Sequence, residues 1–240
     1  MQFLKKDPTD IQFAAEIVPA ILETTFAEVK RKIELVEGVV KTAQVDLMDG
    51  IFVPAYTWPY EDHTSVHDSG ETGGDIDDIE KLDTKVAIEL HCMMVNPEEV
   101  LHEWLTHGVV KRVLIHPEST THLDRALEII RDMKRQAGLS LNLSTPIESI
   151  APYMDRVTHV QLMSIEKVGF GGQPFAEDVL PRIQKLRAMF PHVTISVDGG
   201  ISEVTAPKVL KAGADILVAG SALFKAQDIK EAAQRLQGVV

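Results

Sequence analysis

The sequence predicts an α/β fold in which eight parallel strands, each followed by a helical segment, close into a single barrel. The length of 240 residues is usual for one such barrel, and we therefore assign residues 1–240 to one domain. Short apolar runs alternate along the chain with segments of helical spacing. The runs are apolar on both faces, which is typical of a parallel sheet covered by helices. Eight such units favour a closed barrel over an open sheet.

The eight runs with the length of strands are Ile17–Leu22, Ala43–Leu47, Val86–His91, Arg112–His116, Leu139–Asn142, Val157–Met163, Val193–Val197 and Ile216–Ala219. The segments with helical spacing are Phe26–Val36, Pro97–Trp104, Leu123–Gln136, Ala176–Met189, Val204–Ala212 and Ile229–Leu236. Many of these segments open near Thr, Asp, Asn or Pro, which are favoured where helices begin. The alternation therefore runs through the whole chain.

Residues 56–83 interrupt this pattern, because they are rich in Asp, Gly, His, Ser and Thr. We interpret them as one long loop between a strand and a helix, with a short helix near Ile76–Leu82. A long loop in a compact domain is either a functional lid or a mobile connection. The lid is one of the two interpretations because the loop directly follows the strand that carries Asp46.

Composition limits the classes of function. The net charge of -12 argues against a nucleic acid or an anionic membrane as partner, although backbone N–H groups on an acidic protein still bind phosphate. No apolar stretch approaches the roughly 18 residues of a membrane span. The first residues lack the apolar region of a signal peptide, and Cys92 is the single cysteine. We therefore expect a cytoplasmic protein without disulfides.

Two carboxylates stand at the C-terminal ends of predicted strands, Asp46 near the end of the second and Asp198 directly after the seventh. A closed barrel brings such strand ends together, so that one carboxylate can remove a proton and the other can return one. Alternation along a strand places Gln44 on the same side as Asp46. His91 ends the third strand, and an imidazole with two carboxylates suits Zn, Fe or Mn. The alternative interpretations are that Asp46 caps a helix and that His91 has only a structural role. Asp49–Gly50 has the composition of a turn.

Glycine-rich segments follow three consecutive predicted strands. A phosphate group is often bound by the last loops of a barrel of this class, and small residues there allow close approach of the backbone. A single glycine group could be a tight turn, but three in succession favour a phosphate cradle. Its residues are Gly169, Phe170, Gly171, Gly172, Gly199, Gly200, Gly220 and Ser221.

Taken together, these motifs resemble those of the ribulose-phosphate 3-epimerase family. The matching segments, in family order, are VDLMDGIFVP at 45–54, ELH at 89–91, GFGGQ at 169–173, VDGGI at 197–201, GAD at 213–215 and GSALF at 220–224. The resemblance implies a TIM barrel of the ribulose-phosphate-binding type that inverts C3 of a ketose phosphate. The implied reaction converts D-ribulose 5-phosphate to D-xylulose 5-phosphate, or acts on a close analogue, by two-base proton transfer through a metal-stabilised enediolate.

The resemblance also implies roles for single residues. Asp46 would be the general base and a metal ligand, Asp198 the opposite acid and a second ligand, and His91 a third ligand. The cofactor would be one divalent ion, Zn, Fe, Mn or Co, and the partner a small phosphorylated ketose held by the glycine segments. The family's habit of self-association implies a homo-oligomer.

The chain departs from the family pattern at two positions of the expected site. Gln44 stands where the family has a histidine, and an amide oxygen is a weaker metal ligand than imidazole. Glu23 stands where the family has a serine, and it could replace the missing ligand, bind a different pattern of substrate hydroxyls or point to solvent. A sugar-phosphate-binding homologue without epimerase activity, and an isomerase or aldolase acting on another phosphosugar, are therefore the alternative functions.

Overall fold

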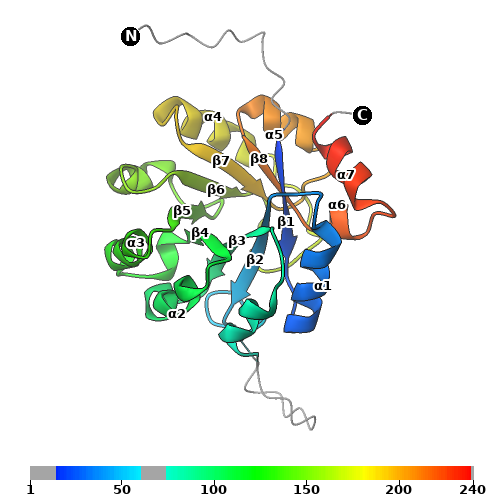
Figure 1. Cartoon of the computed structure of the whole chain (residues 1–240). Helices are drawn as coiled ribbons and strands as arrows, with labels where there is room; N and C mark the ends of the chain where they lie inside the picture. The colour runs from blue at the N-terminus through cyan, green and yellow to red at the C-terminus, as the bar shows by residue number, and fades with distance from the viewer. Residues whose placement is uncertain (1–14, 61–73, 239–240) are drawn as a thin grey trace, which may run out of the picture.

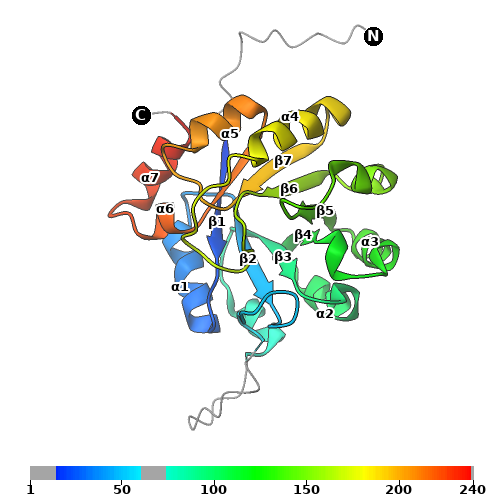
Figure 2. The same cartoon turned by 180° about the vertical axis from the view of Figure 1, so that it is seen from behind.

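The computed structural model describes residues 15–60 and 74–238, and these form a closed barrel of parallel strands with helices outside (Figures 1 and 2). The strands follow one another in chain order around the barrel, and β1 pairs with β8 to close it. Their bounds are β1 Glu16–Ile21, β2 Thr42–Met48, β3 Ala87–Met93, β4 Val110–Ile115, β5 Gln136–Leu141, β6 His159–Met163, β7 Thr194–Asp198 and β8 Ile216–Ala219. The predicted (β/α)8 fold is confirmed.

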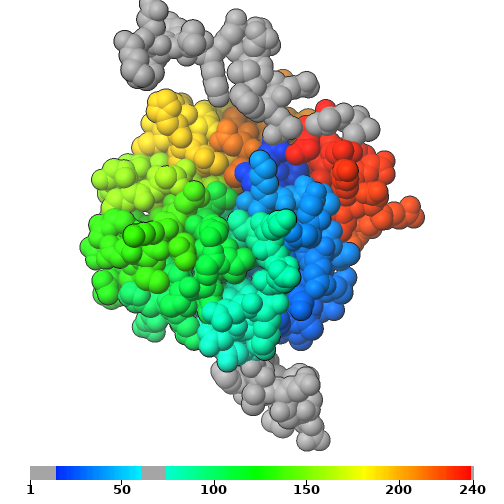
Figure 3. Space-filling model, in the orientation of Figure 1, coloured from blue at the N-terminus to red at the C-terminus, as the bar shows by residue number. Residues whose placement is uncertain are grey.

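The helices lie outside the ring of strands (Figure 1). The α-helices are α1 Phe26–Val36, α2 Leu101–Thr106, α3 Leu123–Asp132, α4 Val179–Met189, α5 Ala206–Ala212, α6 Ser221–Phe224 and α7 Ile229–Leu236. The 3₁₀ helices are η1 Ile76–Lys81, η2 Pro97–Glu99, η3 Pro117–Ser119 and η4 Ile147–Tyr153. In Figure 3 the blue start of the described chain lies beside its red end, as closure of the barrel requires.

Some element bounds differ from those expected. The predicted helix 123–136 ends at Asp132, because Lys134 adopts a positive φ of 57° and Gln136 already begins β5. The connection after β5 is the 3₁₀ helix η4, which contains Pro152 and was not predicted. Within the predicted loop 56–83, the short helix is present as η1. Residues 61–73, and with them the lid interpretation, lie outside the described residues.

The inner surface of the barrel has an apolar side and a polar side. Val18 and Ala20 of β1 pack against Ile216 and Val218 of β8. The inward positions of β2 to β7 are largely polar, and buried examples are Gln44, Asp46, Glu89, His91, Ser140, His159, Gln161 and Ser196. Buried polar groups need partners, so this side of the barrel must contain a connected network of hydrogen bonds.

Along β2, alternate residues face opposite sides of the barrel wall. The inward residues are Gln44 and Asp46, whereas Val45 and Leu47 belong to the apolar core outside the barrel. This core holds the helices to the strands, and its members include Trp104 of α2 and Ile33 of α1. No helix among residues 15–60 and 74–238 is long and apolar enough to cross a membrane.

Candidate functional site

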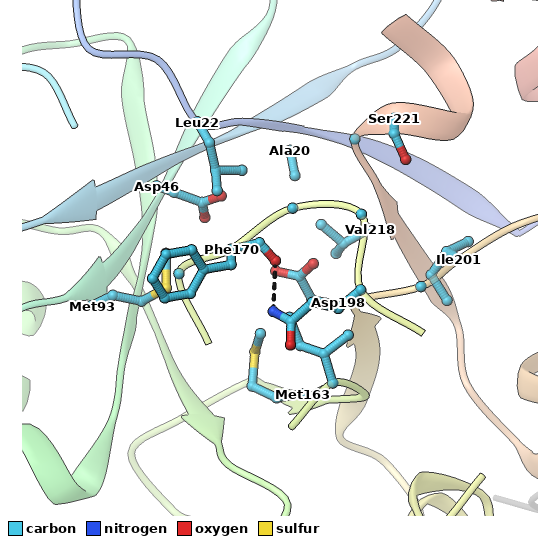
Figure 4. Close-up of a pocket in the computed structure, with 18 of the residues that line it drawn as sticks. Ala20, Leu22, Asp46, Met93, Met163, Phe170, Asp198, Ile201, Val218 and Ser221 are labelled. Carbon is cyan, nitrogen blue, oxygen red and sulfur yellow. Dashed lines mark hydrogen bonds between the residues drawn. The ribbon is translucent and has the colours of Figure 1, made fainter. Parts of the chain in front are cut away.

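A cavity of about 260 Å³ lies at the C-terminal ends of the strands. Asp46 and Asp198 line it from β2 and β7, and Figure 4 shows both carboxylates directed into it. Ala20, Leu22 and Val218 form an apolar wall on the side of β1 and β8. The remaining wall is made mainly by glycine-rich loops. The cavity therefore combines two acidic groups with a backbone-lined recess.

The strand register brings Asp46, His91 and Asp198 together. Asp46 lies beside His91 because β2 pairs with β3 in parallel register, and His91 Nδ1 is 2.9 Å from Asp46 Oδ1. Closure of the barrel places the end of β7 near the ends of β2 and β3, and Asp198 Oδ2 lies 3.7 Å from His91 Nδ1. One ligand atom from each residue lies within 4.8 Å of the other two. The three predicted metal ligands therefore form one cluster.

Gln44 also belongs to this cluster. Its side chain is fully buried, and its Nε2 donates to Asp46 Oδ1 at 2.8 Å and to Asp198 Oδ2 at 2.9 Å. Among the described residues, no hydrogen bond reaches the second oxygen of either carboxylate, Asp46 Oδ2 or Asp198 Oδ1. Each aspartate can thus contribute one oxygen to the cluster and present the other to a substrate.

Three further residues contact the cluster and were not predicted. Gln161 of β6 donates to Asp198 Oδ2 at 3.3 Å. His91 Nε2 lies 3.0 Å from Ser140 Oγ and 2.9 Å from His116 Nε2. Alternation along β5 and β6 places Ser140 and Gln161 on the inward face, which is the one signal in the sequence that could have identified them.

Burial dominates the electrostatics of the cluster. It raises the pKa of Asp46 to about 8. It also raises the pKa of Asp198 to about 7, with a further contribution from the charge of Asp46. Burial lowers the pKa values of His91 and His116 to about 4. Without a bound cation the cluster therefore favours neutral imidazoles and keeps protons on its carboxyl groups well above the usual range.

The stability of the metal-free protein is expected to fall as the pH rises from 6.5 to 8. The raised pKa values of Asp46 and Asp198 mean that the folded state binds more protons than the unfolded state, which lowers stability with rising pH up to about 8. The lowered pKa values of His91 and His116 act in the opposite direction, but only between about 4 and 6.5. Above pH 6.5 these histidines no longer contribute, and we expect Asp46 and Asp198 to lower the free energy of unfolding by about 2 kcal/mol. The buried Glu89, whose pKa is also raised, acts in the same direction.

Denaturant unfolding at pH 6.5 and pH 8, with a chelator present, measures this change. The Asp46→Asn variant serves as the control, since it removes the group with the larger effect and should show a smaller loss between the two pH values. Equal losses in the two proteins would show that the fall arises from groups other than Asp46.

The three glycine-rich loops meet at the cavity. All eight residues predicted for the phosphate cradle line it. At Gly200 the φ is 63°, and a Cβ atom would lie 2.8 Å from the backbone of Phe175, so the close approach of these two loops requires glycine. Gln173 holds the loop after β6 by donating to the carbonyl of Phe170 at 2.8 Å, the bond drawn in Figure 4.

Two acidic residues singled out in the sequence have partners outside the cavity. Glu23 forms an ion pair with Lys32 of α1 and is not among the residues that line the cavity. Asp49 accepts hydrogen bonds from the backbone N–H groups of Ile51 and Phe52, and its other oxygen accepts from Val95. Asp49 therefore stabilises the turn after β2, as its Asp-Gly sequence predicted.

Comparison with known proteins agrees with this geometry. Residues 16–224 match the model of the ribulose-phosphate 3-epimerase family. The chain belongs to that family. It is 32% identical over 229 residues to ribulose-phosphate 3-epimerase of Bacillus subtilis, covering 93% of this chain and 98% of that protein. It is 35% identical to the chloroplastic ribulose-5-phosphate-3-epimerase of Arabidopsis thaliana, covering 90% of this chain and 74% of that protein.

A solved structure shares the fold at much lower identity. KGPDC from Streptococcus mutans superposes with a TM-score of 0.69 and 14% identity, covering 94% of this chain and 97% of that chain. At this identity the likeness shows the barrel alone. Membership of the ribulose-phosphate 3-epimerase family therefore rests on the sequence match, and this family is one of carbohydrate epimerases.

Proposed function

We propose that this member of the family inverts C3 of D-ribulose 5-phosphate to give D-xylulose 5-phosphate, or acts in the same way on a close analogue. One observation carries the proposal. The carboxylates of Asp46 and Asp198 enter a single cavity from β2 and β7, beside a recess lined by glycine backbone. Such an arrangement allows proton removal and proton return at one carbon atom.

In the proposed mechanism Asp46 removes the C3 proton, which is acidic because it lies α to the C2 carbonyl. Asp198 then delivers a proton to the opposite face of C3, and the configuration is inverted. The roles exchange in the reverse reaction. In the metal-free protein burial raises the pKa values of both groups. The positive charge of a bound cation would lower these pKa values, so that Asp46 can lose its proton and act as the base.

The residues present suit a divalent cation, which we propose to be Zn, Fe, Mn or Co. Asp46, His91 and Asp198 would hold it through the three clustered ligand atoms. Gln44 is also buried at this cluster, and among the described residues its Oε1 has no hydrogen-bond partner. When bound, the cation supplies positive charge that stabilises the negative charge developing on the substrate oxygens.

The phosphate group of the substrate would lie in the glycine recess. No residue that lines the cavity, within the described part of the chain, is lysine or arginine. Backbone N–H groups of Gly169–Gly172, Gly199, Gly200, Gly220 and Ser221 would therefore bind the anion. This explains how an acidic protein can bind a phosphorylated sugar.

Exchange of solvent hydrogen into C3 of ribulose 5-phosphate tests the proposal. Protein loaded with Mn²⁺ or Co²⁺ in ²H₂O should incorporate deuterium at C3 and form xylulose 5-phosphate, both detectable by NMR. Unphosphorylated ribulose is the matched substrate, and its kcat/KM should be at least about 100-fold lower, because it forgoes the hydrogen bonds to phosphate that stabilise the transition state.

Absence of both exchange and inversion with every one of the four metals would overturn the ribulose 5-phosphate assignment. A thermal-shift screen of sugar phosphates would then separate a binding homologue from an isomerase or aldolase, because turnover accompanies stabilisation in the second case alone. The expected cytoplasmic location and homo-oligomeric state remain predictions.

A further inference from the structure

The carboxamide of Gln44 lies in contact with all three candidate metal ligands. Its Nε2 is 2.8 Å from Asp46 Oδ1, 2.9 Å from Asp198 Oδ2 and 3.3 Å from His91 Nδ1. These residues make up the cluster that could hold an ion. The partly positive NH₂ group thus provides the compensation that the buried carboxylates would otherwise obtain from a cation.

The other end of the same carboxamide is unsatisfied. Gln44 Oε1 is buried and, within the described chain, has no hydrogen-bond partner. A buried acceptor without a partner destabilises the folded state. Reversing the amide would place the NH₂ group in this unsatisfied position and direct Oε1 toward two carboxylates. Such a reversal of the amide is favourable only when a positive charge lies between Oε1 and the two carboxylates.

A second glutamine in the same network shows the contrast. Gln161 Nε2 also donates to Asp198 Oδ2, at 3.3 Å, but its Oε1 accepts from Ser196 Oγ at 3.1 Å. Ser196 Oγ is in turn 2.7 Å from His159 Nε2. The orientation of Gln161 is therefore held at both ends of its amide, whereas that of Gln44 is held at one end.

We propose that Gln44 is a ligand of the divalent cation through Oε1, and that its amide turns over about its terminal torsion when the ion binds. In the metal-free protein Nε2 bridges the two carboxylates, and in the loaded protein Oε1 replaces it beside the ion. The terminal torsion of glutamine has a broad, roughly two-fold profile, so the rotation itself costs little. This inference rests on the proposed function, because it assigns a cation to the same site.

The proposal has a consequence for metal choice. Two aspartates, one glutamine and one histidine supply three oxygen donors and one nitrogen donor. Oxygen donors suit Mn²⁺, whereas imidazole suits Zn²⁺. Replacing Gln44 by histidine should therefore shift the ratio of affinities toward Zn²⁺.

Calorimetric titration of the full chain, stripped by a chelator, tests the inference without measuring turnover. Gln44→Leu should weaken Mn²⁺ binding at least tenfold, because an oxygen ligand is lost. Gln173→Leu is the matched control, since Gln173 lines the same cavity but hydrogen-bonds to Lys167 and Phe170 and, within the described chain, to none of the three candidate ligands, and its Mn²⁺ affinity should stay within threefold of the unmodified protein. An unchanged affinity in Gln44→Leu would overturn the proposal. Tighter binding would also overturn it, because the amide would then only compete with the ion.

Gln44→His keeps the inference testable if the leucine variant does not fold. It should raise the preference for Zn²⁺ over Mn²⁺ at least tenfold and change the visible absorption of bound Co²⁺, and the absence of both effects would contradict the proposal. Failure of this inference is distinct from failure of the proposed function. Epimerisation with a Gln44-independent metal affinity would remove the ligand assignment alone, and Gln44-dependent binding without epimerisation would remove the function alone.

Discussion

Replacing either Asp46 or Asp198 by asparagine should lower kcat for inversion of ribulose 5-phosphate by about 10³-fold or more. Asparagine keeps the size of the side chain and can still hydrogen-bond to Gln44, but it neither accepts nor returns the proton. The two carboxylates enter the cavity from different strands, so neither can substitute for the other. Coupled assay of xylulose 5-phosphate measures the loss of turnover.

Isotope exchange adds a finer test of the two-base mechanism. With Asp198→Asn, Asp46 should still remove the C3 proton of ribulose 5-phosphate and return a solvent deuteron to the same face. Exchange would then continue without inversion. Inversion in either asparagine variant at more than a tenth of the unmodified rate would contradict an acid–base pair.

A matched control lies three residues from Asp46. Asp49 has the same chemistry, but its carboxylate accepts backbone hydrogen bonds from Ile51, Phe52 and Val95. Asp49→Asn keeps one acceptor oxygen for Ile51 and Phe52 and loses the bond from Val95, and activity within about threefold of the unmodified protein is expected. A loss as large as that of Asp46→Asn would indicate that the turn, rather than proton transfer, limits the reaction.

Replacing Arg112 by methionine should lower the free energy of unfolding by about 3–5 kcal/mol. Arg112 forms an ion pair with Glu89 inside the barrel, where the Glu89 side chain is 1% exposed. Burial raises the pKa of Glu89, and Arg112 opposes that shift. Without the guanidinium, the carboxyl must either stay charged without a partner or take up a proton.

The double variant Glu89→Leu/Arg112→Met distinguishes loss of a partner from loss of packing. Removing both charged groups leaves no isolated charge. The free energy of unfolding of the double variant should therefore lie within about 1 kcal/mol of that of the unmodified protein. Denaturant unfolding of the two single variants and the double variant completes the cycle. A double variant as unstable as Arg112→Met would show that packing around the methionine, not the isolated carboxylate, causes the loss.

The local pattern of apolar and polar residues was sufficient to predict most of the fold. Each of the eight strands lies where an apolar run predicted it, because parallel strands buried on both faces cannot accept polar residues at outward positions. The predicted helices are wrong where the local backbone conformation, and not the periodicity of the sequence, sets where an element ends. At Lys134 the positive φ ends α3 early and lets β5 begin at Gln136. After β5, a 3₁₀ helix containing Pro152 replaces a regular helix.

The sequence by itself determined the alternation of strands and helices, the family and the residues Asp46, His91 and Asp198, because periodicity and short motifs are local properties of the chain. Tertiary structure decided which atoms meet. Gln44 touches Asp198, 154 residues away, only because the barrel closes, and Glu23 pairs with Lys32 of α1 instead of entering the cavity. Hydrogen bonding and burial depend on neighbours from other strands, and these neighbours exist only in the closed barrel.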